Sequence, residues 1–325
     1  MKNSIVITSI FGPTKTAQTC SQWTDWATFV IGDRKTPPWH HDGVEYYSLA
    51  QQVADFGKIF PENSYARKNI GYLYAMRNGS EWILETDDDT YPLERIDDYL
   101  CLNVEAPVLT ADVGYVNSFA PYFPNDHVWP RGFPLQYLNE KPRVEASVKR
   151  TCPLRQFMIA GNSDFDAIYR LTGKSLNIDS SHRQQYLVDD AAYAPVNTQA
   201  TLWHRSVFPL LYLPSTTTMR VCDILKGYVA QRCLKAKGWS IGIAPALFFQ
   251  ERNAHDYFQD FKGEVPLYLY TRDIVEGLKA LTLTGDLCQD LRLCYTYLCD
   301  TFENKGLIHK EELTLLNKWL TLCHE

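Results

Sequence analysis

Several kinds of sequence feature are missing from this chain, and each absence excludes a class of protein. No stretch of the 325-residue sequence approaches the roughly 18 consecutive apolar residues of a membrane-spanning helix. The nine cysteines form no CxxC pair and show no zinc-finger spacing, so reduced thiols are the simplest expectation. Acidic residues outnumber basic ones by 38 to 32, so the chain lacks the positive excess of a general nucleic-acid binder.

Familiar catalytic motifs are also missing. The sequence has no GxSxG elbow, Walker loop, GxGxxG or HExxH, which leaves hydrolase, kinase and dehydrogenase functions without a site. The first residues, MKNSIVITSIFGPTK, lack the long apolar segment and small-residue cleavage site of a signal peptide. We therefore expect a cytoplasmic protein with no transmembrane segment. The sequence leaves its oligomeric state open.

Short Val- and Ile-rich runs alternate with helix-like segments through the first hundred or so residues. The pattern predicts strands at 4–10, 26–33, 81–87 and 106–113, and helices at 46–56 and 64–79. Buried strands that alternate with helices indicate an α/β fold with a mostly parallel sheet covered on both faces.

The rest of the chain is predicted to be irregular first and helical later. Residues 115–160 are rich in Pro, Gly and aromatic residues and predict an irregular excursion. Helices are predicted from Asp166 and over 221–238, and the last fifty residues have helical periodicity. We expect a catalytic domain over 1–270 and a helical C-terminal appendage over 271–325.

The stretch EWILETDDDT places three aspartates, Asp87, Asp88 and Asp89, directly after a predicted buried strand. Adjacent like charges repel, so they need water, a cation or a basic partner. An EF-hand is excluded, because the sixth loop position counted from Asp87 is Pro92 instead of Gly. A solvated turn is one interpretation. The other is an Asp-x-Asp motif of the GT-A type of glycosyltransferase, in which a divalent cation holds the diphosphate of a nucleotide sugar.

Two further stretches bear on this choice. Arg67 and Lys68 stand at the start of a predicted helix, where cations and free amide groups can bind an anion. Asp33 ends the second predicted strand, where it is able to accept a hydrogen bond from a base or a ribose. An ordinary polar helix start and a simple turn are the alternatives.

Longer blocks carry a family resemblance. The blocks VIGDRKTP, FPENSYARKNIGYLYAMRNGSEWILETDDDT, VWPRGFPL, FDAIYRLT, NTQATLWHRSVFPLLYLPSTTTMRVCDILKGYVAQR and ERNAHDYFQDF occur in this order. Together they resemble the STELLO-type glycosyltransferases and, more distantly, the reversibly glycosylated polypeptides, which are UDP-arabinopyranose mutases. The resemblance covers roughly residues 1–270. We expect the chain to depart from the Golgi members of the family in one respect, because no N-terminal transmembrane anchor is seen in the sequence.

The resemblance implies a GT-A fold and a nucleoside diphosphate sugar, UDP-linked, as donor. The expected function is transfer of a hexosyl or pentosyl group to a glycan or other hydroxyl acceptor, with Mn²⁺ or Mg²⁺ as cofactor. Two alternatives stay open: a nucleotide-sugar mutase, and a non-catalytic scaffold that binds nucleotide sugars. Donor turnover in the presence of metal separates them.

The candidate residues take the following roles in this interpretation. Asp87, Asp89 and His255 are the predicted metal ligands, although a lone His such as His255 is more often structural. The predicted donor-binding residues are Thr8, Asp33, Arg67, Lys68, Asp87, Asp88, Asp164 and Asp166.

Asp164, Asp166 and the predicted catalytic residue, Asp223, also have competing structural explanations. Asp164 and Asp166 suit sugar hydroxyls, but a helix N-cap explains one of them, for which Asp164 is the better placed. Asp223 stands at the head of the helix predicted over 221–238, where it is either a first-turn residue or the general base of an inverting reaction.

Overall fold

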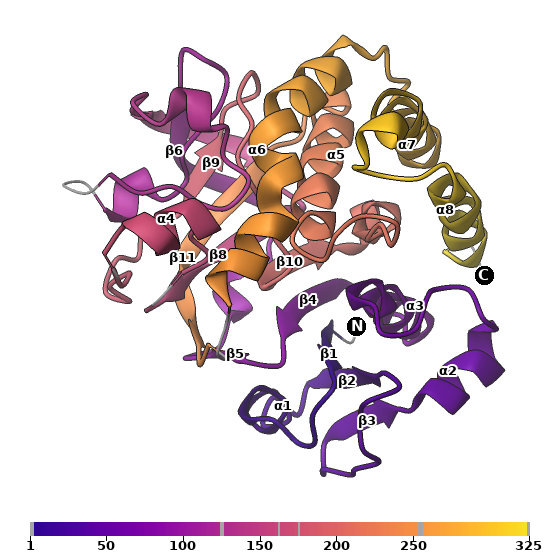
Figure 1. Ribbon diagram of the computed structural model, residues 1–325. Coiled ribbons are helices and arrows are strands. Elements are labelled where there is room, and N and C mark those ends of the chain that lie inside the picture. The colour runs from indigo at the N-terminus through magenta and orange to yellow at the C-terminus, as the bar shows by residue number, and fades with distance from the viewer. Residues whose placement is uncertain (1–2, 124–126, 162, 175, 253–255, 324–325) are drawn as a thin grey trace.

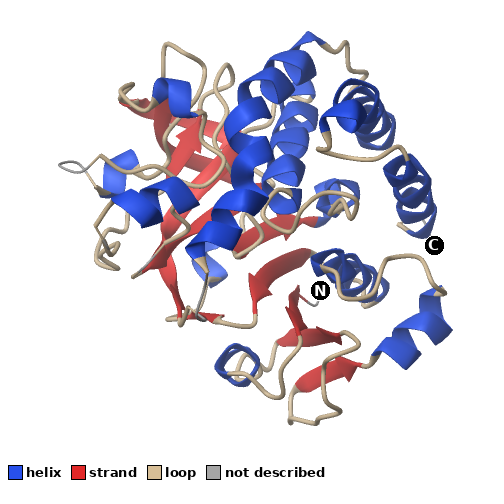
Figure 2. Ribbon diagram, in the orientation of Figure 1, coloured by secondary structure: helices blue, strands red, loops and turns tan. Residues whose placement is uncertain are grey.

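The computed structural model describes residues 3–123, 127–161, 163–174, 176–252 and 256–323. Within these ranges one sheet of eleven strands runs through the molecule, and helices pack along it (Figures 1 and 2). Four neighbouring strands near the N-terminus are parallel. In spatial order they are β3 (Val44–Tyr47), β2 (Trp26–Gly32), β1 (Asn3–Ser9) and β4 (Trp82–Asp87).

The sheet continues beyond β4 with strands of both directions. The order is β10 (Ala200–His204), β8 (Leu154–Ala160), β11 (Ile241–Gln250), β9 (Tyr186–Val188), β6 (Asn103–Thr110) and β7 (Arg143–Thr151), with β5 (Thr90–Pro92) beside β11. Strands β5, β6, β9 and β10 run against the other strands. The prediction of an α/β fold with a mostly parallel sheet and a helical C-terminal region is confirmed.

The helices begin and end for local reasons. Ser48 caps α2 (Leu49–Phe56) in a reciprocal capping box with Gln51, so Tyr46 and Tyr47 belong to β3 instead of the helix predicted over 46–56. Helix α3 (Lys68–Arg77) is followed by Gly79, whose φ of +72° suits a glycine. The remaining helices are α1 (Lys15–Cys20), α4 (Ala167–Thr172), α5 (Cys222–Ala236), α6 (Tyr257–Ala280), α7 (Leu287–Phe302) and α8 (Glu311–Leu322).

Several strands were not predicted. The segment 115–160, expected to be irregular, contains β7 and β8. No strand was predicted over 241–250, where β11 lies between β8 and β9. The expected division at residue 270 falls inside α6 and stays a prediction. Among the described residues, no helix combines the length and the apolar character that crossing a membrane requires.

A buried ion pair joins β4 to α5. The Lys226 ammonium lies 2.7 and 2.9 Å from the two carboxylate oxygens of Glu85, and both side chains are almost fully buried. The Trp203 indole and the Tyr72 hydroxyl also donate to the Glu85 carboxylate. Burial lowers the pKa of Lys226, and the Glu85 charge opposes that shift. The pair therefore fixes α5 and α3 against the middle of β4.

Replacing Lys226 by Met should leave the Glu85 charge buried and uncompensated. We expect the free energy of unfolding, measured by urea denaturation, to fall by about 3–5 kcal/mol. The control is Arg143→Met, which breaks an exposed pair with Asp112 and should cost under about 1 kcal/mol. Similar losses of unfolding free energy in the two variants would contradict the conclusion that the buried pair stabilises the fold more than an exposed one.

Candidate functional site

A cleft of about 430 Å³ lies where the carboxyl ends of β1, β2 and β4 meet the loops of the second half of the sheet. Its size falls in the usual range for small-molecule sites, and this edge is where α/β sheets bind ligands. Eight of the predicted site residues line it: Thr8, Asp33, Arg67, Asp87, Asp88, Asp89, Asp164 and Asp223. Lys68 and Asp166 lie behind its walls, and His255 lies outside the described residues.

Lys68 acts on Asp87 instead of facing the cleft. Its fully buried ammonium donates to Asp87 Oδ1 at 2.7 Å and to the Tyr65 hydroxyl at 2.8 Å. The Tyr65 hydroxyl donates to the same Asp87 oxygen. These contacts compensate the Asp87 charge from the protein interior and fix the orientation of its carboxylate. The predicted contact of Lys68 with a diphosphate stays a prediction.

Asp88 and Asp89 have no such cationic partner within the described ion pairs. Burial raises the pKa of Asp88 to about 6; the Ser9 hydroxyl, which donates at 2.6 Å, opposes this shift, and the neighbouring aspartates add to it. Burial and the Asp87 charge likewise raise the pKa of Asp89, against a 3.0 Å hydrogen bond from the Gln250 amide. Two half-buried carboxylates with incompletely compensated charge remain.

Their hard oxygen atoms are the ligand type that Mn²⁺ and Mg²⁺ prefer, so the donor set fits such a cation. Within the described residues, however, no group of three or more His, Cys, Asp or Glu side chains is arranged to hold a metal ion. The predicted third ligand, His255, is outside those residues. The metal site therefore stays a prediction.

At the β2 end of the cleft, Asp33 organises a loop. Its Oδ1 accepts the backbone amide of Asn63 at 2.9 Å, and its Oδ2 accepts that of Ser64 at 3.1 Å. The guanidinium of Arg67 is held by Gln52 and by the Phe60 carbonyl. Both side chains thus have structural partners, and their predicted contacts with the donor stay predictions.

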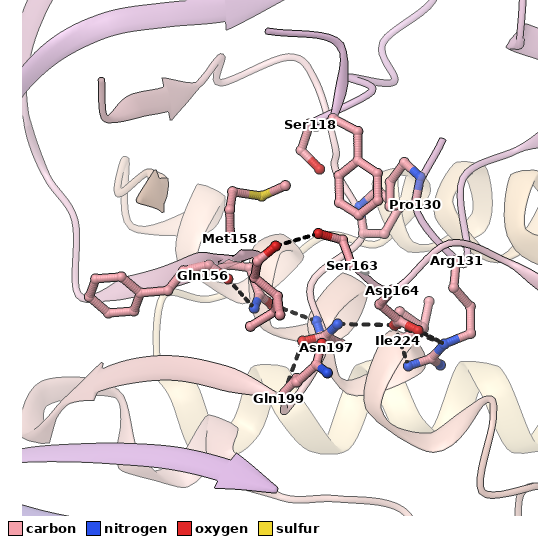
Figure 3. A pocket seen from close by; sticks show the side chains of 14 residues that line it. Ser118, Pro130, Arg131, Gln156, Met158, Ser163, Asp164, Asn197, Gln199 and Ile224 are labelled. Atoms are coloured by element: carbon pink, nitrogen blue, oxygen red, sulfur yellow. Dashed lines mark hydrogen bonds and ion pairs between the residues drawn. The ribbon is translucent and has the colours of Figure 1, made fainter. Parts of the chain in front are cut away.

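Arg131 connects two of the predicted residues at the other end. Its guanidinium donates to both oxygens of Asp223, at 2.8 and 2.7 Å, and lies 2.8 Å from Asp164. Burial alone would raise the pKa of Asp164, but Arg131 and Arg220 outweigh it and hold that pKa well below its usual range. Figure 3 shows Asn197 beside this group, where its amide donates to Asp164 at 3.0 Å.

Asp166, not Asp164, caps α4, so the assignment of the cap to Asp164 was wrong. The Asp166 carboxylate accepts the Tyr169 amide at 2.7 Å and the Trp129 indole at 2.5 Å. Burial raises its pKa to about 6. These contacts explain Asp166 without a ligand, since it does not line the cleft. Asp164 is free of the capping role and faces the cleft.

Two arginines of the cleft were not predicted. Arg220 is held by the buried carboxylate of Glu264. Arg252 follows β11, and its buried Nε has no hydrogen-bond partner among the described residues. The Arg252 guanidinium donates to the Gln250 amide oxygen at 3.5 Å; burial lowers the pKa of Arg252, and the Asp164 charge opposes that shift. A sequence-based prediction of β11 would have placed Arg252 just beyond the carboxyl end of a strand and so made it a candidate site residue.

Comparisons with known proteins agree with the sequence blocks. A sequence model of the family described as STELLO glycosyltransferases matches residues 220–324. An Arabidopsis thaliana protein described as probable glycosyltransferase STELLO2 is 26% identical over an alignment of 305 positions that covers 85% of this chain and 39% of that protein. Probable glycosyltransferase STELLO1 of the same plant is 28% identical over an alignment of 270 positions that covers 74% of this chain and 34% of that protein. The resemblance to the STELLO-type family is confirmed, and the chain spans well under half of either relative.

Asp223 lies in the first turn of α5, as expected, but its ion pair gives it a structural role that the sequence did not reveal. Asp223→Asn should weaken the bidentate pair with Arg131 and lower the free energy of unfolding by about 1.5–3 kcal/mol, as measured by urea denaturation. Unchanged stability with loss of turnover would instead identify Asp223 as the general base.

Proposed function

We propose that this chain is a metal-dependent glycosyltransferase that takes a sugar from a UDP-linked donor and transfers it to a hydroxyl acceptor. One observation carries the proposal: half-buried groups of opposite charge, Asp89 and Arg252, lie on the two sides of Gln250 and make no direct ion pair in the described part of the chain. Its amide nitrogen contacts Asp89, and its amide oxygen faces Arg252. The similarity to proteins described as probable glycosyltransferases supports the same function.

A cation–diphosphate unit is complementary to this arrangement. Asp88 and Asp89 offer oxygen ligands to a cation, while the guanidinium of Arg252 offers a planar donor set that suits phosphate oxygens. When bound, Mn²⁺ or Mg²⁺ would neutralise the diphosphate as it leaves. A neutral ligand would leave these half-buried charges without a direct ion pair in the described part of the chain, which is less favourable than pairing them with a charged ligand.

The other cleft residues suit the remaining parts of a nucleotide sugar. Asp87, held through one oxygen by Lys68, presents the other oxygen for a hydroxyl of the ribose or the sugar. Asp164 is ionised and fixed by Arg131 and Asn197, so it is prepared to accept sugar hydroxyls. The loop held by Asp33 borders the opposite end of the cleft, where we assign the nucleoside.

Calorimetric titration with UDP and Mn²⁺ tests the cation–diphosphate contact. Asp89→Asn should abolish metal-dependent binding, and Arg252→Gln should weaken it about ten- to a hundredfold, because hydrogen bonds to charged groups contribute about 1.5–3 kcal/mol. The matched controls are Asp98→Asn and Arg205→Gln, two exposed residues that do not line the cleft. Equal UDP affinity in Asp89→Asn and in its control would refute the assignment.

Incubation of the wild-type chain with UDP-sugars and Mn²⁺ separates the alternatives. Release of free UDP supports a transferase, whereas an isomerised donor without added acceptor identifies a mutase. Binding of the UDP-sugar without turnover, whether or not an acceptor is added, identifies a scaffold.

The pH dependence of binding follows from Asp88. Because its pKa is raised to about 6, the carboxylate is protonated below that pH and binds a cation poorly. Affinity for UDP and Mg²⁺ should rise about tenfold per pH unit as the pH approaches 6 from below, and level off above about pH 7. The stability of the fold depends on pH in the opposite direction. The contribution of Asp88 to the free energy of unfolding is present at low pH and is lost as the pH rises from the ordinary carboxyl pKa through about 6. A flat affinity profile in the wild-type chain would contradict this reasoning.

A further inference from the structure

The side chain of Gln250 lies between an acidic and a basic residue of the cleft and contacts both. Gln250 is the last residue of β11, is half-buried and lines the cleft. Its amide nitrogen donates to Asp89 Oδ2 at 3.0 Å, and its amide oxygen accepts from the Arg252 guanidinium at 3.5 Å. One neutral amide thus connects the predicted cation ligand to the arginine that we assign to the diphosphate.

Without a ligand, only one orientation of this amide suits both neighbours. An ionised carboxylate only accepts hydrogen bonds and a guanidinium only donates them, so the nitrogen must face Asp89 and the oxygen must face Arg252. The backbone holds the amide in place, because Gln250 pairs with Thr90 in the antiparallel β5–β11 ladder. The next backbone amide, that of Glu251, donates to the Asp89 carbonyl at 2.8 Å. Asp89 and Gln250 therefore stay side by side whichever way the amide points.

A half-turn about the last side-chain bond of Gln250 exchanges the amide nitrogen and oxygen with almost no change of shape. This torsion joins an sp³ to an sp² carbon, and such torsions are broad and roughly two-fold. Beside a cation at Asp89 the nitrogen is unfavourable, whereas the oxygen of a Gln side chain is an ordinary ligand of hard divalent cations. The rotated amide would turn its nitrogen toward Arg252, so that two donors meet. The guanidinium then loses this acceptor and is available to a phosphate oxygen.

We propose that Gln250 couples the binding of a divalent cation at Asp89 to the binding of a diphosphate at Arg252. The amide donates to Asp89 in the free chain, and in the complex it rotates to offer its oxygen to the cation and to release Arg252. This inference rests on the proposed function. The coupling is reciprocal: a phosphate that draws Arg252 away from Gln250 favours the rotated amide and therefore favours the cation.

A crystal structure of the wild-type chain with UDP and Mn²⁺ tests the rotation directly. We expect the Gln250 amide to contact Mn²⁺, which it can do only through its oxygen, and to have left Asp89 as a donor. The internal control is the buried Gln231, whose amide donates to the carbonyls of Ala194 and Gly227 and does not line the cleft. Its contacts should be unchanged. A complex in which the Gln250 nitrogen still donates to Asp89 would overturn the proposal.

Calorimetry measures the coupling as the ratio of the UDP affinities with Mg²⁺ and with EDTA. Gln250→Met keeps the length of the side chain and removes both polar atoms. We expect the ratio to fall about tenfold or more, because UDP binding with Mg²⁺ loses the contribution of a ligand oxygen. UDP binding in EDTA should not weaken, since Arg252 then has no amide oxygen to leave.

Gln250→Glu provides a second variant of nearly the same size. Its carboxylate cannot donate to Asp89 and should pair with Arg252, so UDP affinity in EDTA should fall about tenfold or more. The matched control is Asn63→Asp, which adds the same charge at an exposed residue of the cleft. The control should change UDP affinity by less than about fivefold, because exposed charges interact weakly.

The outcomes separate this inference from the proposed function. A Gln250→Met variant whose affinity ratio equals that of the wild-type chain overturns the coupling and leaves the transferase intact. Equal losses of UDP affinity in Gln250→Glu and Asn63→Asp, measured in EDTA, overturn it as well. Absence of UDP binding by the wild-type chain, with Mg²⁺ and with EDTA, overturns the proposed function and the coupling together.

Discussion

Two lysine ammonium groups buried beneath β4 determine how the acidic residues of the cleft behave. Lys226 compensates Glu85 in the middle of the strand, and Lys68 compensates Asp87 at its end. Glu85 and Asp87 point to the same side, as alternate residues of a strand do. Charged side chains on β4 are therefore tolerated in the protein interior, because each is paired with a lysine. Asp88 and Asp89, beyond the end of β4, form no ion pair with either ammonium group among the described residues, and this leaves their charge available to a ligand.

At the other end of the cleft, the arginines likewise divide into those paired with protein groups and one that is not fully paired. Arg131 uses its guanidinium on Asp164, Asp223 and the Arg220 carbonyl, so it is occupied by protein groups. Arg220 is likewise held by Glu264. Arg252 alone among these three arginines keeps a buried nitrogen without a partner in the described part of the chain. The cleft thus has rigid charged walls and a small number of groups whose charge is unsatisfied, and such a division suits a charged ligand better than an apolar one.

The sequence predicted β1, β2, β4, α2 and α3 well, because each is marked by local composition, although it missed the short β3. It missed β11, where Pro245 interrupts the run and a register irregularity between Ala244 and Phe248 accommodates it. It also missed β7, an exposed edge strand whose charged residues hide the pattern. The ion pair of Arg131 with Asp223 joins residues 92 positions apart, so no local spacing indicates it. The presence of several acidic residues in one cleft could be predicted from the sequence, but the side chains with which they pair could not.

The helical C-terminal region contributes to the cleft through the loop that carries Met219 and Arg220. The buried carboxylate of Glu312, in α8, accepts the amides of Ser215 and Thr216 at 3.1 and 2.7 Å. Glu264, in α6, holds the Arg220 guanidinium and also accepts the amide of Ala167, the first residue of α4. Both ends of this loop are therefore fixed by helices that follow it in sequence. Since the matched family segment, 220–324, includes Arg220, Asp223, Arg252 and these two glutamates, the similarity covers one wall of the cleft together with the helices that support it.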